Sequence, residues 1–117
     1  MHFAITTTWG PTDTTRAALP FIFASSAIAA GDTAMIMLFN DSVIVAVEGT
    51  YEGMIPVGPT ERFAEVFAHP NAEIVVSKSC ADARGITADM LVKNCRFGGM
   101  NDFHAHIALD DCKAVSF

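Results

Sequence analysis

One continuous apolar run, Thr33–Phe39 (TAMIMLF), constrains the fold of this chain more than any other segment. It is bounded by Gly-Asp on one side and Asn-Asp on the other, which is typical of a short strand between turns. A strand that is apolar along its whole length favours a parallel sheet that helices cover on both faces. The rest of the sequence is therefore expected to supply helices on both sides of this strand.

Strand-like and helix-like segments alternate along the chain. Residues 41–48 are ambiguous, because their β-branched content favours a strand and their place directly after another strand favours a short helix. Residues 50–59 are expected to form a loop. The alternation predicts an α/β fold with a single domain over residues 1–117. The predicted architecture is a three-layer α/β/α sandwich around a mainly parallel sheet of roughly five strands. Strands are expected at 2–8, 33–39, 73–78, 95–97 and 112–117, and helices at 14–30, 60–68, 88–93 and 101–110.

The first predicted helix, residues 14–30, carries two unusual features. Pro20 should kink it, or else the helix begins near Leu19 with Pro20 in its first turn. Apolar residues also lie on nearly every side of this helix, whereas a helix packed on a sheet needs a single apolar stripe. In a chain with 51% hydrophobic and 17% charged residues, that surplus predicts a homo-oligomer.

Charge and hydropathy exclude several classes of protein. Seven Lys and Arg residues stand against 13 Asp and Glu, which argues against a direct nucleic-acid partner. The longest apolar stretch, residues 17–30, contains a proline and is shorter than the roughly 18 residues that a membrane span needs. An odd number of cysteines, three, and no positively charged leader favour a cytoplasmic protein.

Cys80 comes directly after the third predicted strand. Parallel α/β sheets place ligands and reactive groups at the carboxyl ends of their strands. A thiol at the start of a helix is favoured as the thiolate, and Lys78 and Arg84 could add positive potential there. The thiolate is the nucleophile in sulfur, acyl and disulfide chemistry. The alternative is that Cys80 is a small buried residue that only fills the core.

The other two cysteines have different sequence environments. Cys95 has Lys93 before it and Arg96 after it, which could lower its pKa and make it a second reactive thiol. The alternative for Cys95 is a buried residue of a short strand. Cys112 begins the last predicted strand and is expected to pack in the core.

The segment after the first strand contains Trp9, Asp13 and Arg16. We expect these three residues to line a crevice beside Cys80, with ordinary helix capping by Thr12 or Asp13 as the alternative. This segment lacks the glycine-rich motifs of nucleotide sites, so no organic cofactor is expected. His104 and His106 are two residues apart, on nearly opposite sides of a helix, so no metal site is expected.

The order of these motifs resembles the DsrE/DsrF-like family of small sulfurtransferases and sulfur carriers. The similarity covers nearly the full length of the chain. The motifs are the turn Trp9–Asp13, the helix end Ala29-Ala30-Gly31-Asp32, Cys80 with Arg84-Gly85-Ile86 behind it, and the terminal Ala114–Phe117.

The resemblance implies a DsrE-like sandwich that assembles as a trimer or hexamer. It also implies that Cys80 accepts sulfur as a persulfide and passes it on, between sulfur donor and acceptor proteins of sulfur oxidation or tRNA thiolation. Two other functions stay open. A non-catalytic binding or scaffold subunit predicts a buried, unreactive Cys80. A redox sensor predicts a disulfide between Cys80 and Cys95.

Overall fold

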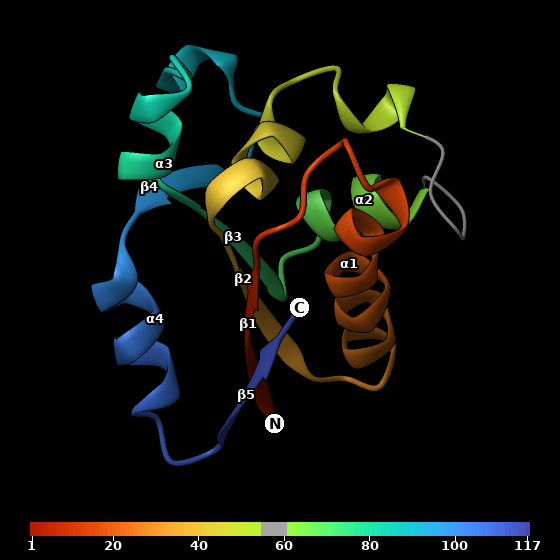
Figure 1. Ribbon diagram of the computed structural model, residues 1–117. Coiled ribbons are helices and arrows are strands. Elements are labelled where there is room, and N and C mark those ends of the chain that lie inside the picture. The colour runs from red at the N-terminus through yellow and green to blue at the C-terminus, as the bar shows by residue number, and fades with distance from the viewer. Residues whose placement is uncertain (55–60) are drawn as a thin grey trace.

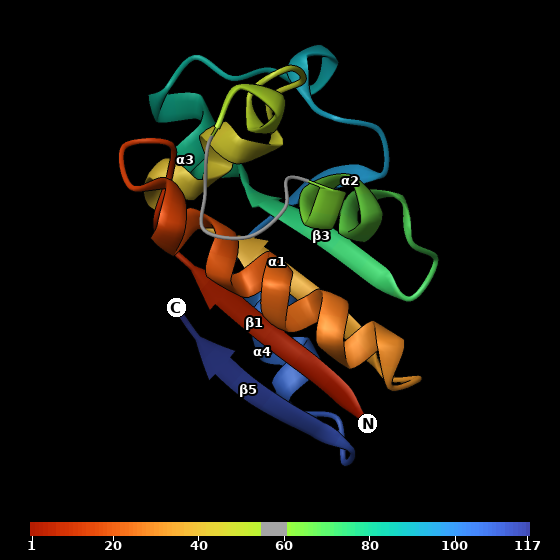
Figure 2. The same ribbon diagram turned by 90° about the vertical axis from the view of Figure 1, so that its right-hand side faces the viewer.

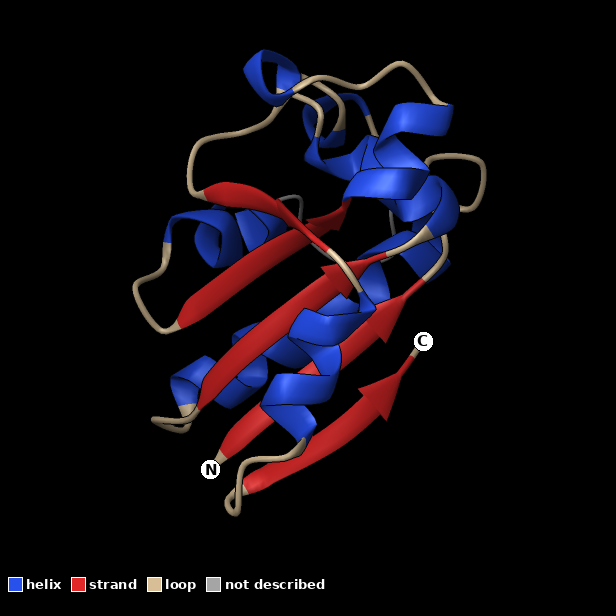
Figure 3. Cartoon of the chain, turned by 90° about the vertical axis from the view of Figure 1, so that its left-hand side faces the viewer, coloured by secondary structure: helices blue, strands red, loops and turns tan. Residues whose placement is uncertain are grey.

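Strand β2 (Thr33–Leu38) lies at the centre of a five-stranded sheet, as its apolar sequence requires. The computed structural model describes residues 1–54 and 61–117. Every strand pair is parallel, and the strand order is β4-β3-β2-β1-β5 (Figure 3). The predicted α/β class is confirmed, and the sheet is parallel throughout rather than mainly parallel. The other strands are β1 (His2–Thr7), β3 (Ala72–Ser77), β4 (Cys95–Gly98) and β5 (Cys112–Ser116).

Helices cover both faces of the sheet, which completes the predicted three layers (Figure 1). On one face lie α1 (Thr14–Ala29) and α2 (Glu61–Ala68), which stand in front of the sheet in Figure 2. On the other face lies α4 (Met100–Ile107), and the six-residue α3 (Lys78–Ala83) follows β3 directly. The layer under α1 and α2 holds the larger core, whereas the core under α4 consists of Ala4, Met35, Met37 and Val75.

Helix α1 begins at Thr14, where the Asp13 carboxylate accepts the N–H of Arg16 at 3.1 Å. Pro20 is buried inside the helix, so the alternative start near Leu19 is wrong. Much of the apolar surface of α1 is covered within the chain, because Phe21 packs against two aromatic rings of α2, whereas Leu19 stays 42% exposed. Phe23 likewise contacts the rings of Phe3 and Phe117. Over residues 1–54 and 61–117, no helix is long and apolar enough to cross a membrane.

The connections differ most from the sequence-based expectations. The ambiguous segment 41–48 is mainly a 3₁₀ helix, Asn40–Ala46, followed by an antiparallel bridge between Val47 and Leu91. Because the backbone at 91–92 pairs with this segment, the expected helix 88–93 is reduced to the 3₁₀ turn Ala88–Met90.

The predicted loop 50–59 contains a 3₁₀ turn, Tyr51–Gly53. Residues 55–59 of that loop and Thr60, the expected start of the next helix, lie outside the described residues. The last helix ends at Ile107 rather than Asp110. It begins at Met100, because the Asp102 carboxylate accepts the N–H of Gly99 at 2.9 Å and so caps the helix there.

Candidate functional site

Cys80 lies just beyond the carboxyl end of β3, in the first turn of α3. This edge of the sheet faces the top of Figure 1, where the strand arrows end. Ser77 is the N-cap residue of α3, and its hydroxyl accepts the N–H of Cys80 at 3.4 Å. The side chain of Cys80 is partly exposed and forms no disulfide. Its thiol is therefore accessible to a small reagent or to a partner protein that approaches this edge.

The residues that face the thiol come from the end of β2. The Cys80 Sγ lies 4.0 Å from Oδ1 of Asn40, the second residue after that strand. The neighbouring Asp41 binds the guanidinium of Arg84, with its Oδ1 at 3.0 Å from Nε and 2.8 Å from Nη2. Arg84 also donates through Nη1 to the carbonyl oxygen of Cys80 at 3.0 Å. Since β2 and β3 are parallel neighbours, their carboxyl ends bring these four residues together.

This environment stabilises the thiolate of Cys80. Burial alone raises the pKa of the thiol, but hydrogen bonding from Ser77, from the Asn40 backbone and from Ser79 acts in the opposite direction. The positive charge of Arg84 acts in the same direction, and the net result is a pKa below the usual value. The geometry therefore provides a partly exposed thiol with an increased thiolate fraction.

Of the two cations that the sequence placed near Cys80, Arg84 alone contacts its backbone among the described contacts. Lys78 forms an exposed ion pair with Asp82 one helical turn later. Its ammonium group also lies 5.4 Å from the centroid of the Phe97 ring. The charge of Lys78 is thus compensated by its own helix, and Arg84 is the cation that acts on the thiol.

The predicted site residues Trp9, Asp13 and Arg16 form a separate group. The Arg16 guanidinium stacks over Trp9 at 4.3 Å from the ring centroid, and its Nε lies 3.7 Å from the Asp13 carboxylate. Their strand, β1, is separated from β3 by β2, and the contacts described for these three residues are with one another and not with Cys80, so their place at the crevice stays a prediction. Asn40 and Asp41 occupy the place next to the thiol.

Gly10 connects the segment after β1 to the site. This glycine is buried, and a Cβ added to it would lie 2.3 Å from the carbonyl oxygen of Asp41. Only glycine allows the two backbones to approach so closely. The segment Trp9–Asp13 therefore supports the turn at Asn40–Asp41 from outside. Asn40 and Asp41 directly follow the apolar run 33–39, which is the sequence signal that could have identified them had the strand order been known.

Cys95 is the first residue of β4 and lies away from the carboxyl edge of the sheet. In the β3–β4 register it is paired with Ile74, three residues before the end of β3. Its side chain packs against the larger core, and burial raises its pKa to about 12. The pKa of Cys95 is thus raised rather than lowered by its surroundings, which favours the alternative of a residue that packs within a short strand. The register separates Cys95 from the end of β3 by about 10 Å along the strand.

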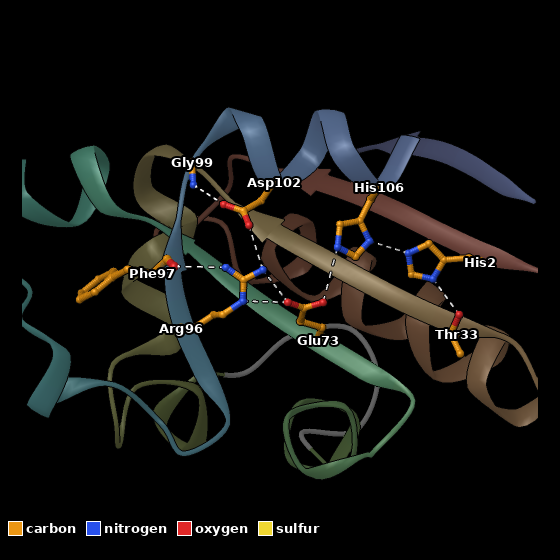
Figure 4. Close-up of polar contacts among 8 residues, drawn as sticks. All are labelled: His2, Thr33, Glu73, Arg96, Phe97, Gly99, Asp102 and His106. Carbon is orange, nitrogen blue, oxygen red and sulfur yellow. Dashed lines mark hydrogen bonds and ion pairs between the residues drawn. The ribbon is translucent and has the colours of Figure 1, made fainter. Parts of the chain in front are cut away.

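Arg96 shows why sequence proximity misled the prediction. Its side chain lies on the α4 face of the sheet, where Nη2 is 2.6 Å from Glu73 and 2.9 Å from Asp102 (Figure 4). Glu73 continues this network to His106 at 3.6 Å, and Nδ1 of His106 is hydrogen-bonded to Nε2 of His2 at 2.8 Å. The network ties α4 to the sheet and occupies the charge of Arg96.

Two further expectations concern Cys112 and metal binding. The sequence predicts that Cys112 packs in the core. It is partly buried and packs against the edge of the smaller core under α4. Within the part of the chain that the structure describes, no group of three or more His, Cys, Asp or Glu residues is placed to hold a metal ion.

Proteins that resemble this chain do so over nearly its whole length. The model of the DsrE/DsrF-like family matches residues 1–115. The crystal structure of the ychN protein from E. coli is similar over 100% of this chain and 99% of that chain, with a TM-score of 0.73 and 16% identity. The MTH1491 protein from Methanobacterium thermoautotrophicum is similar over 99% of this chain and 98% of its own, with a TM-score of 0.77 and 12% identity. No curated protein sequence matches this chain.

Proposed function

The chain belongs to the DsrE/DsrF-like family, and we propose that it is a small cytoplasmic sulfur carrier that holds sulfur as a persulfide on Cys80. The observation that carries this proposal is the environment of the thiol. Cys80 is partly exposed at the carboxyl edge of the sheet, and its pKa is lowered by the groups around it. The partners we propose are donor and acceptor proteins of a sulfur relay, of the sulfur oxidation or tRNA thiolation type.

The chemistry needs no cofactor, oxidant or reductant. The Cys80 thiolate attacks the outer sulfur of a donor persulfide, and a new S–S bond forms on Cys80. The S–S bond of the donor breaks, and the donor leaves as a thiolate with the electron pair. In the second transfer an acceptor thiolate attacks the outer sulfur, and the Cys80 thiolate leaves. A lowered pKa serves both steps, since it raises the thiolate fraction and makes Cys80 a better leaving group.

The two other functions have less support from the described residues. A non-catalytic scaffold subunit predicts a buried, unreactive Cys80, whereas this thiol is partly exposed. A redox sensor requires the Cα atoms of Cys80 and Cys95 within about 7 Å. Cys95 pairs with Ile74, well before the end of β3, and its raised pKa of about 12 also opposes thiol exchange.

Sulfur loading tests the proposal directly. The protein is incubated with glutathione persulfide, and its intact mass is recorded before and after addition of a thiol reductant. We expect the wild-type protein to gain the mass of one sulfur atom, which the reductant removes. Cys80→Ser should gain none, and Cys112→Ser, the control, should load like the wild type. An unchanged wild-type mass, or equal loading of Cys80→Ser, would overturn the proposal.

We also propose that the chain assembles as a homo-oligomer, either a trimer or a hexamer, through the surface around α4. Three large apolar residues, Met100, Ile107 and Leu109, are 62%, 40% and 53% exposed and lie on this helix or just after it. This group of exposed apolar residues is larger than that on α1, where Leu19 is the large apolar residue that stays exposed among the described residues. Sedimentation should show an oligomer for the wild type and a smaller species for Leu109→Lys, and a wild-type monomer would contradict this assembly.

A further inference from the structure

We propose that Asn40 is a positioning residue for the Cys80 thiolate and that Asp41, Arg84 and Gly10 hold it in place. The use of this device in sulfur transfer rests on the proposed function, but its effect on the thiol can be measured without any sulfur donor. Three independent features of the structure lead to it: the backbone conformation of Asn40, the contact of its amide with the thiol, and the supports on both sides of the turn.

The backbone of Asn40 lies in the left-handed region, with φ of 50°. Residues other than glycine adopt this conformation at a cost, and asparagine tolerates it better than most. The conformation ends β2 abruptly and turns the chain into the 3₁₀ helix Asn40–Ala46. Unfavourable backbone conformations persist where the surrounding structure enforces them, and they are concentrated at functional sites. At residue 40 this conformation places the side-chain amide of Asn40 beside the thiol of Cys80.

The amide of Asn40 matches both protonation states of the thiol. Oδ1 is the acceptor for the S–H group at 4.0 Å. When the proton leaves, sulfur needs donors, and hydrogen bonding from the Asn40 backbone is one of the causes that lower the pKa of Cys80. The side-chain NH₂ group can also take the place of Oδ1 by a rotation about the last side-chain bond. An aspartate at this position, which only accepts when ionised, could serve the thiol but not the thiolate.

Asp41 and Arg84 join this turn to the helix that carries Cys80. One carboxylate oxygen of Asp41 accepts both Nε and Nη2 of Arg84, while Nη1 of Arg84 donates to the Cys80 carbonyl oxygen. The guanidinium therefore bridges the end of β2 and the start of α3. Its planar group of donors makes such a two-sided bridge possible, whereas a lysine offers a single ammonium group.

Ser42 and Gly10 also hold the turn at Asn40–Asp41 in place. The buried hydroxyl of Ser42 lies 2.6 Å from the carbonyl oxygen of Phe39 and 3.0 Å from that of Thr7. Gly10 packs directly against the Asp41 backbone, where no side chain fits. Asn40 is thus held between supported neighbours on either side, so that its amide is positioned before a sulfur donor arrives.

The test is the pH dependence of alkylation of Cys80 by iodoacetamide, followed by peptide mapping. Asn40→Asp keeps the size of the side chain and adds a negative charge, so the midpoint of the profile should move to higher pH by about one unit, a tenfold loss of rate near neutral pH. Asn40→Gly keeps the left-handed backbone and its hydrogen bonding to the sulfur but removes the side-chain amide with its NH₂ donor, so it should move the midpoint in the same direction by less. Asn94→Gly is the matched control, because Asn94 also has a positive φ of 71° and directly precedes a cysteine, Cys95.

Unshifted midpoints in both Asn40 variants, with unfolding transitions like that of the wild type, would overturn the positioning role. An equal shift in Asn94→Gly would also overturn it, because the effect would then not be specific to residue 40. The outcome is separable from sulfur loading. If the midpoints shift as expected while the wild type takes up no sulfur, the sulfur-carrier proposal fails and the positioning role stands.

Discussion

Cys80 follows β3 and Cys95 begins the adjacent strand β4, and each has cationic residues near it in the sequence, yet the pKa values of the two thiols are shifted in opposite directions. Around Cys80 several groups donate to the sulfur or place positive charge beside it, and its pKa falls. Cys95 packs against apolar side chains, and burial raises its pKa to about 12. The comparison teaches that a cation near a cysteine in the sequence lowers the pKa of its thiol only if the fold brings the charge close to it. Arg84 donates to the Cys80 carbonyl oxygen and its charge lowers the pKa of that thiol, whereas Arg96 binds Glu73 and Asp102.

The largest expected effect is the difference in native reactivity between these two thiols. Near neutral pH, iodoacetamide should label Cys80 at least about a thousandfold faster than Cys95, since each pKa unit changes the thiolate fraction tenfold. Peptide mapping after short exposure measures both rates in one sample. Denaturant should make the two rates similar. Similar rates in the native protein would contradict the difference between the two thiol environments.

A methyl group at position 10 should disturb the Cys80 end of the molecule alone. In Gly10→Ala the new Cβ would meet the Asp41 backbone at 2.3 Å, so the turn must shift. We expect a loss of roughly 1–3 kcal/mol in the free energy of unfolding, typical of overpacking, together with slower alkylation of Cys80. Denaturant titration and alkylation measure the two effects.

Gly53→Ala is the control for this substitution, because a Cβ at position 53 meets no atom within 4 Å. It should leave the stability within about 0.5 kcal/mol and the Cys80 rate unchanged. A Gly10→Ala protein as stable and as reactive as the wild type would show that the turn at Asp41 is not under the constraint described here.

Substitution of the two arginines should give opposite patterns. Arg84→Ala removes a positive charge near the thiol, so the alkylation midpoint of Cys80 should rise, with a several-fold loss of rate near neutral pH. Arg96→Ala breaks exposed ion pairs to Glu73 and Asp102 and should cost no more than about 1 kcal/mol of stability, with no change at Cys80. An equal change in Cys80 reactivity for both variants would contradict the separation of the two regions.

The smallest expected effect is a pH dependence of the α4 region. Burial lowers the pKa of His2, and the nearby His106 lowers it further. Below the usual histidine pKa the unfolded state therefore binds more protons than the folded state, and stability falls as the pH decreases. The pKa of Asp102 is lowered, chiefly by its bond from the Gly99 N–H and by Arg96. Its stabilisation is present above the usual carboxyl pKa and is lost as the pH falls through the folded value.

Hydrogen exchange localises this pH effect. Between about pH 7 and pH 5, α4 should lose protection after correction for intrinsic rates, while the α1–α2 layer should not. His2→Gln removes the titrating partner of His106 and should reduce the loss. Equal loss of protection in both layers would indicate a global effect and not one centred on the network of Figure 4.

Much of the fold followed from local sequence patterns. The apolar run 33–39 predicted a central parallel strand, and β2 is that strand with helices on both faces. The position of Cys80 after a strand predicted its place at the carboxyl edge of the sheet. These predictions succeeded because strand periodicity, apolar length and turn residues act within a few residues of one another. The covered face of α1 was missed, because nothing local to that helix states that α2 packs on it.

The order of the strands and the direction of each side chain were decided only by the tertiary structure. Strand order placed Asn40 and Asp41 beside the thiol, and kept Trp9, Asp13 and Arg16 a further strand away. Register and burial separated Cys95 from Cys80. The sequence by itself determined an α/β sandwich with a cysteine at the carboxyl edge of its sheet. The pairing of distant segments then selected the groups that face that cysteine, because contacts between strands depend on residues far apart in the chain.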